Sequence, residues 1–498
     1  MSIWEAFGAV FEPTTFAMMM IGCIGGILIG AIPGLSGSTG IILLLPLVYT
    51  LDMLPALVVM AGMFCGTMYG GAIPAVLIQT PGTPSAAATT LDGYPLAQQG
   101  KAGKAITIAL VASVIGGLFS GVCLMILSPI LAGWALQFQA PEYFALALFG
   151  LALIASSSND LLKGLLSGFM GIFIGCIGVN VITGTQRFTF NSVFLMGGIN
   201  VLPLLVGLFA ISQVFLDVKE DRENLPMQQT KAKDYWLTKS EWKRIAMPVL
   251  VASIVGVVIG VVPGAGGGIA CFLGYEAVKK FSKHPEEYGK GSIEGLAAAE
   301  SANNATTGGA LVPLITLGVP GDAVTAVMLG AFMLVGIRPG PLLFVNFANE
   351  MQMFFVAFIV MQIVILILGA LGTSLFIKVL QIPKSILMPA VMLLCFLGAY
   401  ALSNSINHAL FALIFGVLGY FMKKYGFPAP PMILGLVLGS MAEQNLNRTL
   451  LIHQGNWGVL FTRPIAGVLM LVAILTILGS LWPVIKARFF KKEKKANA

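Results

Sequence analysis

The sequence reads GAIPGLSG at residues 30–37 and GVVPGAGG at residues 260–267. Each stretch interrupts a long apolar run, and the two match at an offset of 230 residues. Proline lacks a backbone donor and glycine tolerates unusual backbone angles, so each stretch is expected to break a helix. A break frees backbone N–H and C=O groups that lipid cannot satisfy. In a membrane it survives only where protein or a water-filled cavity surrounds it.

The composition around the breaks predicts a polytopic α-helical membrane protein. Of the 498 residues, 57% are hydrophobic and 10% are charged, and the mean hydropathy is +0.92. Apolar runs of about 20 residues, long enough to cross a bilayer, recur along the chain. These values exclude a cytosolic globular enzyme, a disordered chain and a disulfide-stapled secreted domain. The six cysteines lie in apolar stretches without a CxxC pair, so we expect packing roles and no metal site.

A second pair of matching motifs indicates an internal repeat. Gly70-Gly71-Ala72, followed by Thr80-Pro81-Gly82-Thr83-Pro84, resembles Gly308-Gly309-Ala310, followed by Val319-Pro320-Gly321-Asp322. The order is the same in both places. We therefore predict two transmembrane repeats, residues 1–217 and 246–498, joined by a charged cytoplasmic linker at 218–245. Glycines spaced by four residues, as at Gly22, Gly26 and Gly30, predict close helix packing.

The distribution of basic residues predicts how the repeats are oriented. The net charge of +7 is concentrated in the linker and in the tail at 486–495, which the positive-inside rule places in the cytoplasm. No nucleic-acid motif accompanies the charge, and none of the chain is expected to bind nucleic acid. The two broken segments then enter from opposite faces, as in inverted repeats. The resulting fold is all-α, with about 11 crossings plus two hairpins, the N-terminus external and the C-terminus cytoplasmic.

Paired helix breaks in paired repeats point to a central transport site. Half-helix N-termini offer N–H groups to an anion, and freed carbonyls can bind a cation. The candidate substrate-binding residues are Pro33, Gly34, Ser36, Gly37, Ser38, Thr39, Thr80, Pro81, Gly82, Thr83, Pro263, Gly264, Gly266, Gly267, Val319, Pro320 and Gly321. The candidate coupling-ion residues are Asn303, Asn304, Thr306, Thr307 and Asp322. Kinked helices that merely pack are the alternative.

These motifs together resemble the large membrane subunit of tripartite tricarboxylate transporters, the TctA family. The resemblance rests on Pro33-Gly-Leu-Ser-Gly, on Tyr69-Gly-Gly-Ala-Ile-Pro through Pro84, and on Pro263-Gly-Ala-Gly-Gly followed by Glu300-Ser-Ala-Asn-Asn-Ala-Thr-Thr-Gly-Gly. It covers nearly the whole chain. It implies carboxylate uptake across the bacterial inner membrane, driven by a sodium or proton gradient and without another cofactor. It also implies a small membrane subunit and a periplasmic solute-binding protein as partners, alongside membrane lipid.

Three other functions remain open from the residues alone. An ATP-driven permease would need a separate nucleotide-binding subunit, because this chain has no GxxxxGK[ST] loop. An intramembrane serine protease would use Ser36, in Gly34-Leu35-Ser36-Gly37, with His408. Gly266 occupies the position that matches Ser36 in the second repeat, which argues against a nucleophile and against an enzyme. An ion or solute channel is the third alternative.

Four acidic residues lie in or near the apolar runs. Asp322 follows Pro320-Gly321 and is expected either to cap the next helix or to bind the ion. Glu300, Asp52 and Asp92 are expected at the membrane interface. No Lys or Arg is predicted at the midplane, so N–H groups, hydroxyls and amides would hold a carboxylate.

The charge distribution makes a prediction about topology. Ser2 is expected on the external face and Ala498 in the cytoplasm. Cysteines placed at each end of a variant without native cysteines should react with impermeant thiol reagents from opposite sides. External labelling at both ends would contradict the inverted arrangement.

Overall fold

Both sequence breaks separate two helices. The computed structural model describes residues 2–156, 160–180, 182–217, 237–379, 384–401 and 405–479. Helix α2 (Pro13–Ala31) ends at the first break and α3 (Gly37–Val48) begins after it. In the same way α13 (Lys239–Val261) and α14 (Gly266–Phe281) flank the second break. The predicted breaks are therefore confirmed.

The described residues form an all-α membrane protein, as predicted. Six helices are long and apolar enough to cross a membrane, and further apolar helices are shorter. The six are Pro13–Ala31, Met53–Ile78, Thr89–Ala135, Lys239–Val261, Ala348–Thr373 and Ile406–Lys424. In the described part of the chain, strand pairing is limited to β1 (Gly178–Val179) and β2 (Gln186–Arg187), which are antiparallel.

Contacts divide the chain into two units. Unit 1 comprises residues 1–136 and 205–420, and unit 2 comprises residues 137–204 and 421–498. Each unit draws on both sequence halves, so the predicted halves 1–217 and 246–498 are not the same division and stay a prediction. Most of the predicted linker, residues 218–236, lies outside the described residues, and α13 already begins at Lys239.

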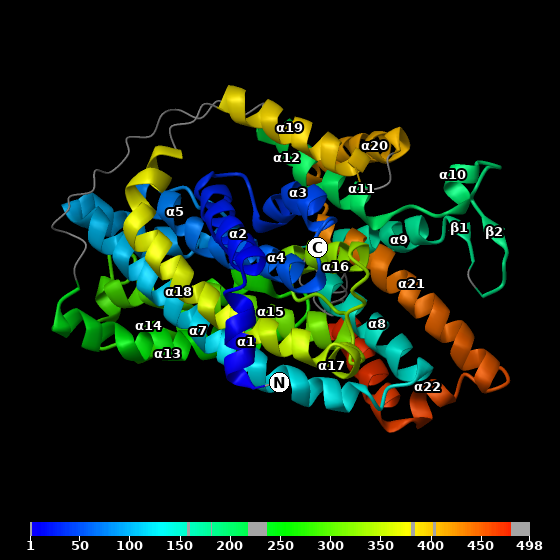
Figure 1. Ribbon diagram of the computed structural model, residues 1–498. Helices are drawn as coiled ribbons and strands as arrows, with labels where there is room; N and C mark the ends of the chain where they lie inside the picture. Colours follow the sequence, from blue (N-terminus) through cyan, green and yellow to red (C-terminus); the bar gives the residue numbers. More distant parts are fainter. Residues whose placement is uncertain are drawn as a thin grey trace, which may run out of the picture. The chain divides into compact units, whose positions relative to one another are not determined.

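Unit 1 holds both broken segments (Figure 1). Besides α2, α3, α13 and α14, its elements are α1 (Ile3–Val10), α4 (Met53–Gly70), α5 (Ala72–Ile78), η1 (Pro84–Ala86), α6 (Thr89–Leu96), η2 (Ala97–Lys101), α7 (Ala102–Ala135), η3 (Val206–Ile211), α12 (Ser212–Asp217), η5 (Pro285–Glu287), α15 (Ile293–Leu317), α16 (Ala323–Leu334), α17 (Leu343–Asn346), α18 (Ala348–Val379), α19 (Lys384–Ala401) and most of α20 (Ile406–Lys424).

The core of unit 1 forms around α4 and α15. Almost every residue of both helices is buried. Helix α4 is apolar on all sides, which is typical of a helix enclosed by others. Helix α15 is enclosed too, although Glu300, Ser301, Asn303 and Asn304 lie in its middle. Polar groups at such a position must bind one another or a ligand.

Close backbone contact joins α2 to α4 and α13 to α15. A Cβ on Gly26 would lie 2.6 Å from the carbonyl oxygen of Met63, and one on Gly256 would lie 2.4 Å from that of Ala302. The equivalent contact is made one turn later by Gly30 and by Gly260. The predicted glycine spacing therefore marks the packing faces, and the two helix pairs pack alike.

Unit 2 is built from α8 (Ala140–Ser156), α9 (Leu161–Gly175) and α21 (Ala429–Ile452), which pack together. The strands, α10 (Val193–Met196), α22 (Val459–Thr462) and most of α11 (Val201–Leu205) complete it. Arg187 makes two bonds to the Glu443 carboxylate, at 2.6 and 3.0 Å. Arg463 lies 2.5 Å from Glu142. Ion pairs thus neutralise both of these arginines within unit 2.

The packing of α2 on α4 predicts the effect of one added methyl group. Gly26→Ala should lower stability by about 1–3 kcal/mol, because the new Cβ meets backbone atoms that cannot move aside. Gly133→Ala, on α7, is the control, since nothing lies within 4 Å of its Cβ. It should be neutral or stabilising by about 0.5–1 kcal/mol. The thermal unfolding midpoints of the two purified variants measure the difference. Equal midpoints would contradict the close approach.

Candidate functional site

The first break forms a turn that ends in a capped helix. Gly34 has φ +100°, a left-handed conformation that suits glycine. Ser36 is the N-cap of α3, and its hydroxyl accepts a hydrogen bond from the Thr39 N–H at 3.4 Å. Ser38 and Thr39 are buried in the first turn of the helix, whereas Pro33, Gly34 and Ser36 are partly exposed. The turn before α3 is therefore only partly covered, whereas the first turn of the helix is enclosed. Capping also accounts for the Ser36 hydroxyl without a nucleophilic role.

The second break is tied to the loop after α15. Gly264 has φ +83°, and its N–H donates a 2.8 Å hydrogen bond to the carbonyl of Gly321. Val319, Pro320 and Gly321 are buried, while Pro263 and Gly264 are partly exposed. The loop at Val319–Asp322 thus supports the turn that leads into α14.

The corresponding loop in the first half, Thr80–Pro84, supports the first break in a similar way. A Cβ on Gly82 would lie 2.0 Å from the carbonyl oxygen of Gly30, and one on Gly321 would lie 2.7 Å from that of Gly260. Thr83 is buried, and its hydroxyl lies 3.0 Å from that of Ser85. Each break therefore packs against a Pro-Gly loop of its own half. The contacts are equivalent.

Each helix N-terminus also meets the other half of the chain. An added Cβ on Gly37 would lie 3.2 Å from the Val324 side chain, at the start of α16. An added Cβ on Gly267 would lie 2.9 Å from the Cβ of Ser85, in η1. The N-termini of α3 and α14 are thereby placed in one connected assembly with all four predicted loops. Ser85 was not among the predicted residues, although it directly follows Thr83-Pro84.

Asn303 supplies a buried acceptor beside α14. Its amide N–H donates to the Met68 carbonyl at 3.4 Å. Its carbonyl oxygen, Oδ1, has no hydrogen-bond partner although the residue is fully buried, and it would lie 3.0 Å from a Cβ on Gly267. An unpaired buried oxygen costs free energy unless a ligand or water binds it. This atom has the chemistry of a cation ligand.

The other predicted ion residues are already engaged. The Thr306 and Thr307 hydroxyls donate to carbonyls of their own helix, at 2.8 and 2.6 Å. Asp322 caps α16, accepting the Thr325 N–H at 2.8 Å. Capping was one of two roles predicted for Asp322, and the geometry shows it. Its role in ion binding stays a prediction.

A second polar cluster surrounds Glu300, one turn along α15. The Glu300 side chain is fully buried within the protein, whereas its predicted interfacial depth stays a prediction. The Ser113 hydroxyl of α7 donates to Glu300 Oε2 at 2.9 Å, and the Thr89 hydroxyl of α6 contacts Oε1. The Asn304 amide donates to Ser113 Oγ at 2.8 Å. Glu300, Asn303, Asn304 and Thr307 are spaced to share one helix face, a sequence signal that would have linked Glu300 to the asparagines.

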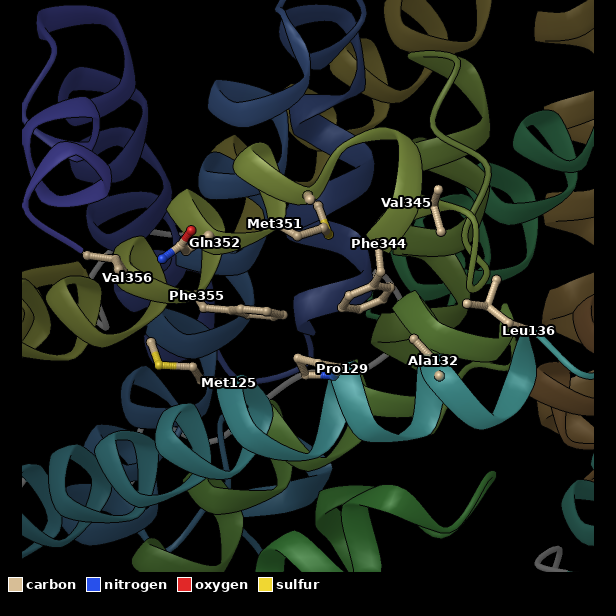
Figure 2. Close-up of a pocket in the computed structure, with 12 residues that line it drawn as sticks. Met125, Pro129, Ala132, Leu136, Phe344, Val345, Met351, Gln352, Phe355 and Val356 are labelled. Atoms are coloured by element: carbon tan, nitrogen blue, oxygen red, sulfur yellow. The ribbon is translucent and has the colours of Figure 1, made fainter. Parts of the chain in front are cut away.

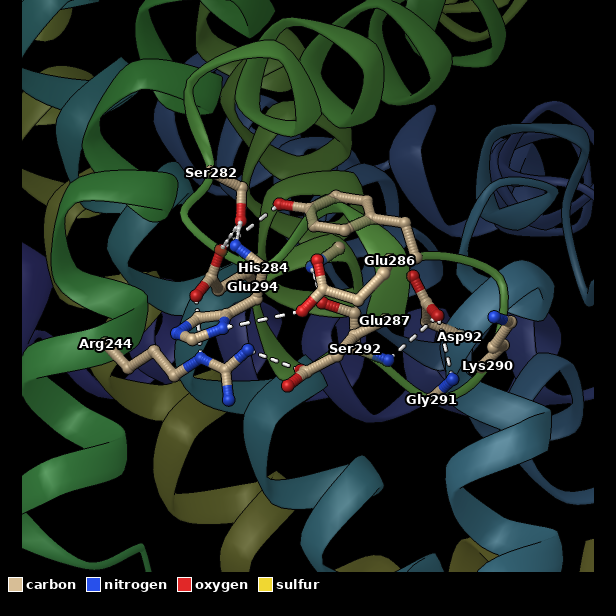
Figure 3. A network of polar contacts seen from close by, with 12 residues as sticks. Asp92, Arg244, Ser282, His284, Glu286, Glu287, Lys290, Gly291, Ser292 and Glu294 are labelled. Atoms are coloured by element: carbon tan, nitrogen blue, oxygen red, sulfur yellow. Dashed lines mark hydrogen bonds and ion pairs between the residues drawn. The ribbon is translucent and has the colours of Figure 1, made fainter.

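Asp92 is likewise buried within the protein, where it binds the backbone of a loop. Its interfacial position stays a prediction. Its Oδ1 accepts backbone N–H groups from Gly289, Gly291 and Ser292 at 2.8–2.9 Å. In the same loop, burial raises the pKa of Tyr288 above its ordinary value. Figure 3 shows this network, which includes the 2.6 Å ion pair between Arg244 and Glu294. The connection from α14 to α15 is thus held against α6 and α13. Asp52, by contrast, is exposed at the start of α4.

A separate cavity of about 450 Å³ lies among α7, α17 and α18 (Figure 2). Its walls are mostly apolar and include Pro129, Phe344, Met351 and Phe355, with Gln352 as a polar exception. It shares no residue with the predicted site. An apolar wall offers no donor to a carboxylate, so this cavity does not replace the helix N-termini as the candidate site.

Comparison with known proteins identifies the family. Residues 16–434 match the model of the tripartite tricarboxylate transporter TctA family. The chain belongs to this family. One relative is an uncharacterised 52.8 kDa protein in the TAR-I ttuC' 3' region of Agrobacterium vitis, 36% identical over 97% of this chain and 96% of its own length. An uncharacterised protein in the TAR-II ttuC' 3' region of the same organism is 35% identical, over 47% of this chain and 96% of its own length. No solved structure matches.

Membership of the TctA family makes this chain a transporter subunit in a membrane, and it supports a non-enzymatic role. Because both relatives are uncharacterised, they carry no substrate over to this TctA protein.

The turn at Gly264 yields a prediction about uptake. Gly264→Val should abolish uptake while the protein still reaches the membrane. A β-branched residue at this φ is strained by about 1–3 kcal/mol and would shift the turn before α14. Gly336→Val is the control, because Gly336 has φ +77° and open space around it. Uptake at matched expression is measured for both variants. Loss of uptake in both variants, or in neither, would contradict a specific role of Gly264 in the substrate site.

Proposed function

We propose that this chain is the large transmembrane subunit of a secondary transporter that imports carboxylates across the bacterial inner membrane. A sodium or proton gradient would drive uptake, and no other cofactor is required. The observation that carries the proposal is the pairing of two helix N-termini, at α3 and α14, each preceded by a partly exposed turn. Helix N-termini bind anions through free N–H groups and the helix dipole. Family membership supports the same conclusion.

The substrate would be bound mainly by backbone. The free N–H groups in the first turns of α3 and α14 would receive the carboxylate, because the Gly264 N–H is already bonded to the Gly321 carbonyl. Ser38, Thr39, Thr80 and Thr83 would be hydroxyl donors nearby. The unpaired Asn303 Oδ1 would bind the coupling cation together with backbone carbonyls. Tricarboxylates or related organic acids fit this anionic class.

The proposal includes an inverted arrangement of the repeats. Gly26 in the first half and Gly256 in the second make equivalent contacts, and so do Gly82 and Gly321. This equivalence supports a repeat. The positive-inside rule is the basis for the opposite orientation of the repeats. It is also the basis for about 11 crossings plus two hairpins, with an external N-terminus and a cytoplasmic C-terminus.

Two partners are part of the proposal. Family membership in a tripartite system suggests a small membrane subunit and a periplasmic solute-binding protein. The binding protein would capture dilute substrate and deliver it to the turns that precede α3 and α14.

Transport by the reconstituted three-component system tests this function. Uptake of di- and tricarboxylates into proteoliposomes is measured with a sodium gradient, a proton gradient or neither. Substrate should accumulate only with a gradient and with the binding protein present. Equal uptake by this chain alone would refute the partner dependence. Flux without countertransport of unlabelled substrate would indicate a channel.

Asn303→Ala examines the ion site in the same assay. Loss of one ligand at a buried polar site costs about 1–3 kcal/mol. The ion concentration for half-maximal uptake should rise, by up to roughly a hundredfold. Asn445→Ala is the control, because Asn445 donates only to the Met441 carbonyl of its own helix. Unchanged ion dependence in Asn303→Ala would place the cation elsewhere.

A further inference from the structure

The buried carboxyl of Glu300 has no cationic partner among the described residues. It lies in the centre of α15 with no exposed surface, and the ion pairs of the described chain involve other carboxylates. Burying an ionised carboxylate without a counter-charge is costly, and protonation removes that cost. A side chain of this kind is retained at a price in stability, so a functional reason is expected.

The hydrogen bonds around Glu300 admit both the charged and the neutral carboxyl. Asn304 Nδ2 donates to the Glu300 main-chain carbonyl at 3.1 Å, an acceptor that fixes the orientation of the amide. Ser113 Oγ accepts from this amide, so its own hydrogen points to Glu300 Oε2. Oε2 is therefore always an acceptor. Oε1 faces the Thr89 hydroxyl, which can donate to a carboxylate or accept from a carboxylic acid.

The titratable groups on the helices around Glu300 bind other residues, are exposed or are ordinarily uncharged. Cys271 of α14 interacts electrostatically with it, and α4 carries Cys65 and Tyr69. Of the basic residues on the adjacent ends of α7 and α13, Lys104 pairs with Glu241 and Arg244 with Glu287 and Glu294. Lys239 and Lys243 of α13 are exposed. Asp92 of α6 binds the loop before α15, with Tyr275 of α14 beside it, and Asp322 caps α16. The described part of η1 has no titratable residue.

The Glu300 cluster is joined to the candidate site along two adjacent segments. On α15, Glu300 and Asn303 lie one turn apart on one face. On the facing segment, Ser85 packs beside Asn303 and Gly267, and Thr89 contacts Glu300. A change at Thr89 thus lies four residues from the contact that supports the N-terminus of α14.

We propose that Glu300 binds and releases a coupling proton during transport. The carboxylate takes one proton on Oε1 from water on one side of the membrane and returns it to water on the other side. This proposal rests on the proposed carboxylate uptake and adds that the proton is a coupling ion. It assigns Thr89 and Ser113 as positioning residues that accommodate the two states.

Glu300→Gln tests the proposal, because glutamine resembles the protonated side chain and cannot release a proton. A pH difference of one unit supports roughly tenfold accumulation per proton. With the membrane potential held at zero and no sodium gradient, proteoliposomes with the wild-type three-component system should accumulate substrate from an acidic exterior. Glu300→Gln should lose this accumulation but retain exchange of labelled for unlabelled substrate. Glu276→Gln, the same change at an exposed site on α14, is the control and should accumulate normally.

The outcomes separate the two proposals. Absence of substrate exchange by the wild type would refute the proposed function itself. Exchange by the wild type without any response to the pH gradient would overturn the role of Glu300 and leave carboxylate transport intact. Normal pH-driven accumulation by Glu300→Gln would overturn it as well.

A spectroscopic measurement checks the protonation independently of transport. Infrared difference spectra of the purified protein, recorded across a pH series, should show a protonated-carboxyl band that Glu300→Gln removes. Ser113→Ala should shift the midpoint of that band in pH, whereas a merely structural serine would leave it unchanged. A band that persists in Glu300→Gln belongs to another residue and would contradict the proposal.

Discussion

Direct backbone contact between helices is the constraint on which this structure depends. In lipid, hydrophobicity does not drive helices together, so small residues that let backbones touch provide much of the association. Gly26 and Gly30 place α2 against α4, and Gly256 and Gly260 place α13 against α15. Gly116 does the same for α7, where an added Cβ would lie 2.3 Å from the Ser301 carbonyl oxygen. The last contact brings Ser113 within reach of Glu300.

The same contacts explain why the helix breaks are stable. Each break frees backbone groups that only protein or water can satisfy. The Gly264 N–H finds the Gly321 carbonyl, and the carbonyl of Gly30 faces Gly82. Because the supporting loops are themselves held on tightly packed helices, the turns before α3 and α14 are positioned by the whole of unit 1 rather than by their own residues.

The elements of the fold that depend on local chemistry were predictable from sequence. The breaks follow from proline and glycine, and the packing faces follow from glycine spacing. The burial of Glu300 and Asp92 was not, because it depends on residues about 200 positions away, such as Thr89 and Ser292. A hydropathy pattern predicts a charged residue near the ends of an apolar helix. A carboxyl group surrounded by hydrogen-bond donors can nevertheless be buried inside the protein. For the candidate site, the sequence identified both turns, whereas Ser85 required knowledge of which loop faces α14.

A proton on Glu300 changes one contact in particular. Ser113 and Asn304 donate toward Oε2 in both states, and α7 is held on α15 by glycine contacts, so that side of the cluster is fixed. Only Thr89 must reverse, from donor to acceptor. Thr89 begins the short helix α6, whose preceding turn carries Ser85 against Gly267. Thr89, which responds to the proton, therefore belongs to the segment that packs on the N-terminus of α14. Protonation of Glu300 is thereby connected directly to the candidate substrate site.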